Sequence, residues 1–102
     1  MSLHSAFANK VDRTYTQGID TYVAGNYIEA KKWIRRAAGE GSVDGMSIYG
    51  VMYLYGRGVA QDGGKAVYWL TRAAKAGEKD AQSLLGIMYA MGQGMDKDLE
   101  KG

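Results

Sequence analysis

Apolar residues recur along the chain at the spacing of helices rather than of strands. The segment 44–55 places its apolar positions three or four residues apart, at Met46, Tyr49, Gly50 and Tyr53. The segment 66–74 repeats this spacing at Ala66, Trp69, Leu70, Ala73 and Ala74. Such spacing gathers apolar side chains on one face of a helix. Both segments are therefore predicted to be amphipathic helices.

Glycine and aspartate mark where these predicted helices end and begin. Gly56 suits the left-handed position that ends a helix, and Gly58 permits the sharp turn that follows. Asp62 is a good N-cap for the next helix, which Gly77 ends. Val59 is expected to fold back over the pair. The stretch 44–77 is therefore predicted to be a helix-turn-helix unit.

This unit repeats with a period of 36 residues. Of the 37 residues from Ala30 to Ala66, 15 are identical to the residue 36 positions later, including Trp33 with Trp69 and Gly50 with Gly86. In the second copy we expect a restart at Asp80 and a buried side made of Leu84, Leu85, Met88 and Tyr89. Self-similarity at such a period is the signature of repeat architectures.

The first and last units depart from this period. The first has a shorter turn at 25–27, between a helix predicted at about 6–24 and a second helix. The apolar face of that second helix is Ala30, Trp33, Ile34 and Ala37. The last unit reaches Gly102 just as its second helix is due, so the stretch from Met95 is expected to be frayed or paired with another chain. The 102 residues are predicted to form one domain, with units at about 6–40, 41–77 and 78–102 and the last unit truncated.

The ordered residues of these units resemble the Sel1-like repeat. The resemblance rests on 85–89 followed by Gly92 and Gly94, and on 50–53 followed by Gly56, Gly58, Val59, Asp62, Lys65, Ala66, Trp69, Leu70, Ala73, Ala74 and Gly77. Small departures are Gly45 for Ala, Tyr49 for Leu and Met95 for Val. The segment 18–38 is more similar to a tetratricopeptide unit, which often precedes Sel1-like repeats.

The resemblance implies an all-α fold, a right-handed α-solenoid of antiparallel helix pairs with about 2.5 to 3 repeats. Members of the family act as adaptors that hold other proteins, often in signalling or in bacterial envelope and host-contact processes. The likeness implies a partner protein or peptide without naming it.

A concave surface is the place where stacked helix pairs bind partners. In the tetratricopeptide arrangement the first helix of each pair lines that surface. Carried over to this chain, the partner-binding positions are Asp12, Tyr15, Ile19, Tyr22, Asp44, Ser47, Val51, Leu54, Tyr55, Asp80, Ser83, Ile87 and Met91. Alternatively, apolar members such as Tyr22, Val51 and Ile87 pack against adjacent helices instead.

The composition argues against several classes of function. The net charge is +2 and there is no cysteine, so neither a nucleic-acid preference nor a disulfide or thiolate metal site is expected. The basic cluster at 31–36 is predicted to be a solvated outer face or a site for an acidic partner. No apolar run is long enough for a membrane span, and no signal sequence is evident. The sequence does not decide the cellular compartment. The protein is cytoplasmic or, if a signal sequence has been removed, periplasmic or secreted.

No motif in the sequence gives a clear indication of catalysis. The glycines at 56–64 resemble a nucleotide-binding loop, but they lack its full pattern and recur with the repeat. His4 has no second histidine for a metal site, and Asp44 and Asp80 are explained as first-turn residues that complement the helix dipole. Trp33 and Trp69 are predicted to be core. No catalytic residue, cofactor or metal is therefore predicted.

Three functions follow from these observations. The leading one is a non-catalytic module that binds a partner peptide or helix. The second is binding or hydrolysis of β-lactams, which some Sel1-like proteins are associated with; those carry cysteine pairs that this chain lacks. The third is self-association through the open C-terminal repeat.

Overall fold

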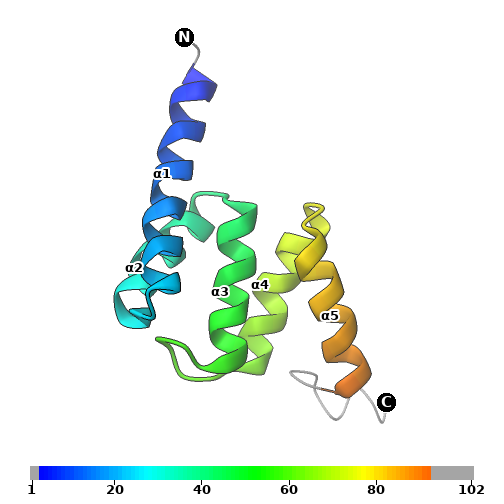
Figure 1. Cartoon of the computed structure of the whole chain (residues 1–102). Helices are drawn as coiled ribbons and strands as arrows, with labels where there is room; N and C mark the ends of the chain where they lie inside the picture. The colour runs from blue at the N-terminus through cyan, green and yellow to red at the C-terminus, as the bar shows by residue number, and fades with distance from the viewer. Residues whose placement is uncertain (1–2, 93–102) are drawn as a thin grey trace.

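The computed structural model describes residues 3–92, with side chains from Lys10 onward. Within that range the chain forms helices and no strands (Figure 1). The helices are α1 (Leu3–Val23), α2 (Tyr27–Gly39), α3 (Val43–Tyr55), α4 (Gly63–Lys75) and α5 (Lys79–Met91). The predicted all-α class is confirmed. The expectation for the stretch from Met95 lies outside the described residues.

The helices form two layers of a solenoid. Each helix packs mainly on the next one in the sequence, with consecutive helices running in opposite directions (Figure 1). Helices α1, α3 and α5 run the same way in the layer nearer the viewer of Figure 1, and α2 and α4 lie behind them. The N-terminal ends of α1, α3 and α5 therefore share one edge of the stack, and their C-terminal ends share the other.

The helix ends follow the predicted turn chemistry. Gly56 has φ of 70°, and its N–H donates to the carbonyl of Met52, which closes α3. The Asp62 side chain caps α4 by accepting from the Lys65 N–H at 3.0 Å. Helix α5 begins one residue before the predicted Asp80, because the Glu78 carboxylate accepts from the Ala81 N–H at 2.7 Å.

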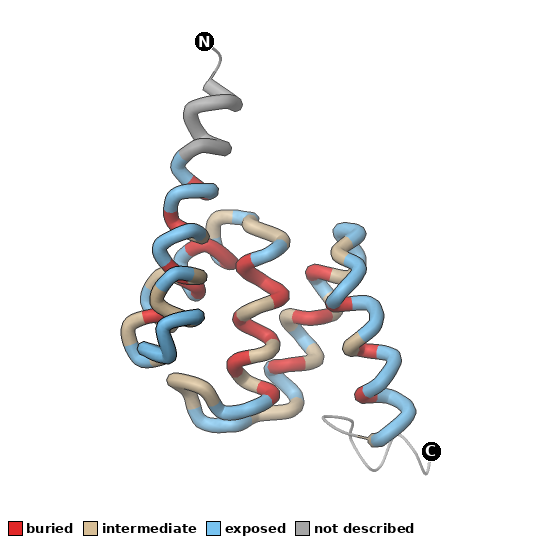
Figure 2. The backbone as a smooth tube through the Cα atoms, viewed as in Figure 1, coloured by how far each residue is buried: buried red, intermediate tan, exposed pale blue. Residues whose placement is uncertain are grey.

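The core runs through the stack as one column of side chains. Helices α2 to α5 each place one large side chain out of solvent entirely, namely Ile34, Met52, Leu70 and Met88. Figure 2 shows buried positions along each of these four helices. Gly50 faces this column, since a Cβ built there would lie 2.7 Å from Cγ of Leu70. The predicted close approach of two helices at Gly50 is confirmed.

Two aromatic predictions need correction. Tyr89 was expected on the buried side of α5, yet it is 58% exposed, because no helix of the described chain covers it. Its counterpart Tyr53 packs against the core, and Nζ of Lys65 on α4 lies 5.4 Å from its ring centre. Trp69 also packs against the core, 5.2 Å from the Tyr49 ring. Trp33 is only half-buried on α2.

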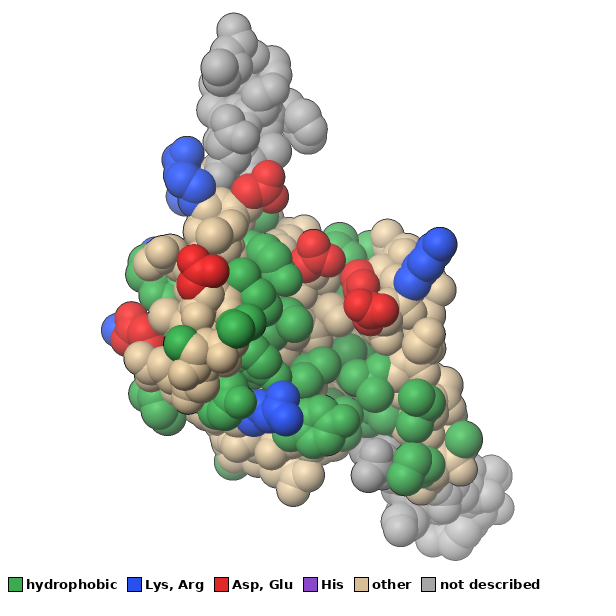
Figure 3. Space-filling model, viewed as in Figure 1, with side chains coloured by type: hydrophobic (Ala, Val, Ile, Leu, Met, Phe, Trp, Pro, Cys, Tyr) green, Lys and Arg blue, Asp and Glu red, His purple; other side chains and the backbone are tan. Residues whose placement is uncertain are grey.

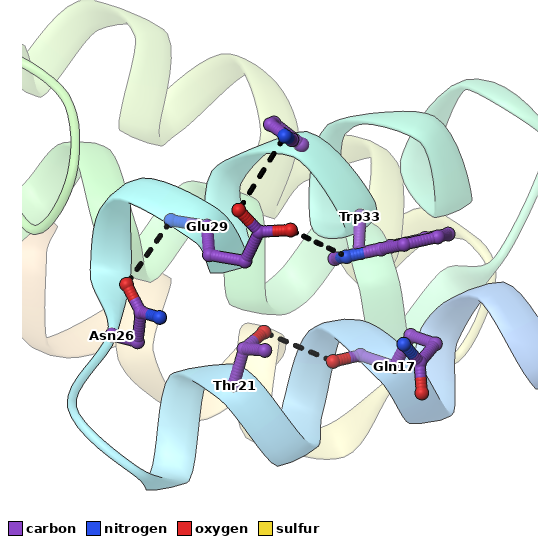
Figure 4. A network of polar contacts seen from close by, with 6 residues as sticks. Gln17, Thr21, Asn26, Glu29 and Trp33 are labelled. Atoms are coloured by element: carbon purple, nitrogen blue, oxygen red, sulfur yellow. Dashed lines mark hydrogen bonds and ion pairs between the residues drawn. The ribbon is translucent and has the colours of Figure 1, made fainter.

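The polar contacts of α2 hold Trp33 at this position (Figure 4). Its Nε1 donates to Oε2 of Glu29 at 3.3 Å, and the other oxygen of Glu29 lies 3.4 Å from Nζ of Lys32. The Glu29 N–H donates to the Asn26 side chain, which caps the helix. The Glu29 carboxylate is therefore committed to partners within α2.

Candidate interaction surface

Apolar side chains gather on the face made by α1, α3 and α5, which we call the α1–α3–α5 face (Figure 3). In Figure 3 hydrophobic side chains spread over these three helices, acidic side chains lie along the upper edge and on α1, and basic groups lie at both ends of the upper edge and at the lower edge. The half-buried members of this apolar band are Tyr15, Ile19, Tyr22 and Val51. The exposed members are Tyr55, Ile87 and Met91, at 55%, 53% and 64%.

The predicted partner-binding positions divide into accessible and interior ones. Ser47 and Leu54 are 7% and 6% exposed, and Leu54 belongs to the core cluster. Both turn into the stack, so they are corrected to interior residues that offer a partner almost no surface. The other predicted positions are half-buried or exposed. The exposed polar ones are Asp12, Asp44, Asp80 and Ser83.

An acidic end borders the apolar band where α3 and α5 begin. Burial raises the pKa of the Tyr15 hydroxyl, and the nearby carboxylates of Asp44 and Glu78 raise that pKa further. The Tyr15 hydroxyl of α1 is therefore within electrostatic reach of carboxylates from α3 and from the residue before α5. The prediction found Tyr15 and Asp44 but missed Glu78. The available signal for Glu78 was its place directly before a predicted helix, where residues whose side chains cap the helix occur.

A tyrosine-bound arginine marks the opposite edge. Arg57, in the loop after α3, donates from Nη1 to the Tyr22 hydroxyl at 2.6 Å. Its guanidinium carbon lies 4.8 Å from the ring centre of Tyr55, 5.7 Å from that of Tyr27 and 5.8 Å from that of Tyr22. The hydrogen bond with Tyr22 is the main reason that the pKa of Arg57 is raised. Cation–π contacts of this kind hold the side chain in place.

Sequence reasoning missed Arg57 because nothing local singles it out. Gln93 takes its place one period later, so the position does not recur. The three rings around the guanidinium come from α1, α2 and α3, which only the folded stack brings together. The one available signal was the unusual tyrosine content, 8 residues against a single phenylalanine.

The α2 and α4 layer is basic and aromatic instead. Lys32, Arg35 and Arg36 are exposed on α2, in agreement with the predicted solvated cluster. Arg36 lies over the Trp33 ring at 5.5 Å, and Arg72 repeats this over Trp69 at 5.1 Å. The arginines cover the outer side of the tryptophans. In each helix a cationic side chain therefore pairs with an aromatic ring of the same helix.

The described part of the chain offers few side chains for chemistry other than binding. Among the described residues, no three or more His, Cys, Asp or Glu side chains are grouped so that they could hold a metal ion. The side chain of His4 lies outside the described part. None of the described helices is both long and apolar enough to cross a membrane.

The comparisons with known proteins decide the family. The model of the Sel1 repeat matches residues 13–42, 43–78 and 79–102. The chain belongs to the Sel1 repeat family. Sel1 repeats are generally protein-interaction scaffolds and typically non-catalytic. Each of the first two matched Sel1 repeats brings one helix to the α1–α3–α5 face and one to the basic layer, and the third brings α5.

A solved Sel1-like structure supports the same architecture. The chain is similar to a protective antigen present in uropathogenic Escherichia coli strains, whose crystal structure displays an SLR fold. The sequences are 34% identical, the match covers 90% of this chain, and the TM-score is 0.78. The chain spans 21% of the length of that antigen. The comparison with curated proteins gives no match.

Proposed function

We propose that the chain is a non-catalytic protein-interaction module that binds a partner segment on its α1–α3–α5 face. The observation that carries this proposal is the continuous apolar band, in which Tyr55, Ile87 and Met91 are each more than half exposed. Isolated apolar residues are common on protein surfaces, whereas contiguous apolar patches mark interaction sites. The charged residues at both ends of the band give it the polar rim that interfaces have.

The side chains that a partner can cover contribute to binding in proportion to their exposed area. Covering the exposed half of an isoleucine or methionine contributes about 1–2 kcal/mol. Ile87 and Met91 are therefore the strongest anchors, and the half-buried Val51 and Ile19 add smaller areas. Most of the band lies on helices that are packed against a second layer, so little conformational entropy is lost at the surface when a partner binds.

A matched pair of isoleucine variants tests the proposal. Ile87 is 53% exposed on the α1–α3–α5 face, and Ile28 is 68% exposed at the start of α2. Because both are exposed, aspartate at either position is expected to leave the fold intact. A display library of random 12-residue peptides is selected on the wild-type chain, and the enriched peptides are then measured on both variants.

We expect Ile87→Asp to weaken binding of the enriched peptides about tenfold or more, and Ile28→Asp to leave it unchanged. The proposal fails if both variants bind as the wild type does, or if no peptide is enriched. Circular dichroism spectra of both variants provide the check on folding. Because the proposed role is binding without turnover, hydrolysis of nitrocefin by the wild-type chain is expected to be absent.

The exposed end of α5 favours a second candidate, self-association. Tyr89 is 58% exposed at the position where Tyr53 of the preceding repeat packs against the core. A second copy placing a helix against α5 would cover Tyr89. This candidate predicts a mass that rises with concentration in light scattering and returns to that of a monomer in Tyr89→Ser. A monomeric mass at all concentrations would exclude it.

A further inference from the structure

We propose that the partner of the α1–α3–α5 face is a protein segment whose apolar side chains are bordered on one side by lysine or arginine. The inference rests on the proposed function and adds the chemistry of the partner. It is argued from the two edges of the apolar band, which carry opposite charge on helices that run in the same direction.

The acidic edge carries charge that the described chain does not neutralise by pairing. Two ion pairs join described side chains, Lys10 with Glu40 and Lys32 with Glu29, and neither uses Asp44 or Glu78. The Glu78 carboxylate accepts hydrogen bonds from the backbone N–H groups of Asp80 and Ala81. Asp44 is exposed in the first turn of α3. A cation brought to this edge therefore gains attraction without breaking an existing pair.

The basic edge sets the direction of the partner. The guanidinium of Arg57 is fixed by three tyrosine rings and by the hydroxyl of Tyr22. The positive charge of Arg57 repels a cation of the partner at this edge, whereas an apolar or acidic side chain of the partner can approach the guanidinium and its rings. The band thus presents opposite charges at the opposite ends of α3.

The distance between the edges suits a single segment. From Asp44 to Tyr55 the rise of 1.5 Å per helical residue gives about 16 Å. One helix with its side chains is about 10–12 Å across, so it fits between the edges with lysine or arginine reaching the acidic one. Extended chain crosses the same distance with about five residues. A helical partner then carries its cations along one border of its apolar stripe, and an extended partner carries them at the end that meets the acidic edge.

The library selection of the proposed function also tests this inference. Peptides enriched on the wild-type chain and lost on Ile87→Asp are those that bind the α1–α3–α5 face. In these peptides we expect lysine and arginine to exceed aspartate and glutamate relative to the input library. If face-dependent peptides are enriched without this excess, the partner chemistry is overturned while the proposed function stands. If no face-dependent peptides appear, both fail.

Removal of charge from the acidic edge and from α2 then assigns the excess to the acidic edge. Asp44→Asn combined with Glu78→Gln removes two charges and is expected to weaken the enriched cationic peptides about five- to tenfold at 0.05 M salt, with a smaller loss at 0.3 M. Glu29→Gln removes one charge, from an acid of α2 that already pairs with Lys32, and it is expected to change binding less than twofold. An equal loss of binding free energy per removed charge in the two proteins would overturn the proposal, because net charge alone would then explain both losses.

Discussion

At the scale of single residues, the two helical glycines of the repeat have the same place in the sequence and different surroundings. A Cβ at Gly50 would lie 2.7 Å from Cγ of Leu70 and 3.2 Å from the carbonyl oxygen of Ala66. At Gly86, which is 36 residues later, a Cβ would meet no atom within 4 Å. Of these two glycines, only Gly50, where α4 packs on α3, lacks room for a side chain.

This difference predicts opposite effects of the same substitution. Gly50→Ala is expected to lower the free energy of unfolding by about 1–3 kcal/mol, because the helices must move apart. Gly86→Ala is expected to raise it by about 0.5–1 kcal/mol, since alanine is the better helix former. Urea unfolding followed by circular dichroism measures both values. Equal effects at the two positions would contradict the packing described for Gly50.

Tyr49 provides a residue-scale prediction that depends on pH. Burial, together with the 3.3 Å hydroxyl contact with Tyr53, raises the pKa of Tyr49 to about 12. Between pH 10 and 12 the unfolded chain loses this proton while the folded chain keeps it, so the free energy of unfolding falls as pH rises. Below pH 10 both states keep the proton and this dependence vanishes.

Urea unfolding at pH 9 and pH 11 checks the pH dependence with phenylalanine variants. Tyr49→Phe is expected to show a smaller fall between the two pH values than the wild type. Tyr89→Phe, which alters an exposed tyrosine, is expected to keep the full fall. If Tyr49→Phe loses as much stability as the wild type over this range, the buried hydroxyl is not the group responsible.

At the scale of elements, the loop between α3 and α4 fastens the second repeat to the first. Arg57 reaches Tyr22 on α1 and Tyr27 on α2, and Gly58 lies so close to Tyr27 that a Cβ there would clash with its backbone. Gly58 also has φ of 74°, a conformation that favours glycine. The loop is therefore a packed connection between two helix pairs as well as a turn.

The Arg57 contacts predict a measurable share of stability. Arg57→Ala is expected to cost about 1–2 kcal/mol, because one hydrogen bond to a charged donor and the cation–π contacts are lost together. Arg57→Lys keeps the charge without the planar group and is expected to recover less than half of that loss. Thermal unfolding of the three proteins checks this order. An alanine variant as stable as the wild type would show that the Arg57 contacts of this loop do not stabilise the fold.

The elements were predictable from the sequence to the extent that their signals are local. Gly56 and Asp62 carry the end of α3 and the start of α4 in their own backbone and side-chain chemistry, and both behave as predicted. The site was less predictable, because burial depends on neighbours that are distant in sequence. Leu54 was expected on the surface and lies in the core, and the rings around Arg57 meet only in the folded stack.

At the scale of the whole molecule, each helix depends mainly on its neighbours in the sequence. Helix α3 packs between α2 and α4, whereas among the described helices α5 packs mainly on α4. In repeat proteins stability is carried by such nearest-neighbour interfaces. Backbone amides of α3 are therefore expected to exchange hydrogen more slowly than those of α5, as hydrogen–deuterium exchange can measure. Equal protection of α3 and α5 would contradict this nearest-neighbour account.

We propose that partners bind across α1, α3 and α5 and not on the basic layer behind them. This can be tested by titrating the isotope-labelled chain with a face-selected peptide and following amide chemical shifts in NMR. We expect the largest shift changes to cluster around Tyr15, Val51 and Ile87, with little change around Arg35 and Tyr68. Changes centred on α2 and α4 would show that partners bind the basic layer instead.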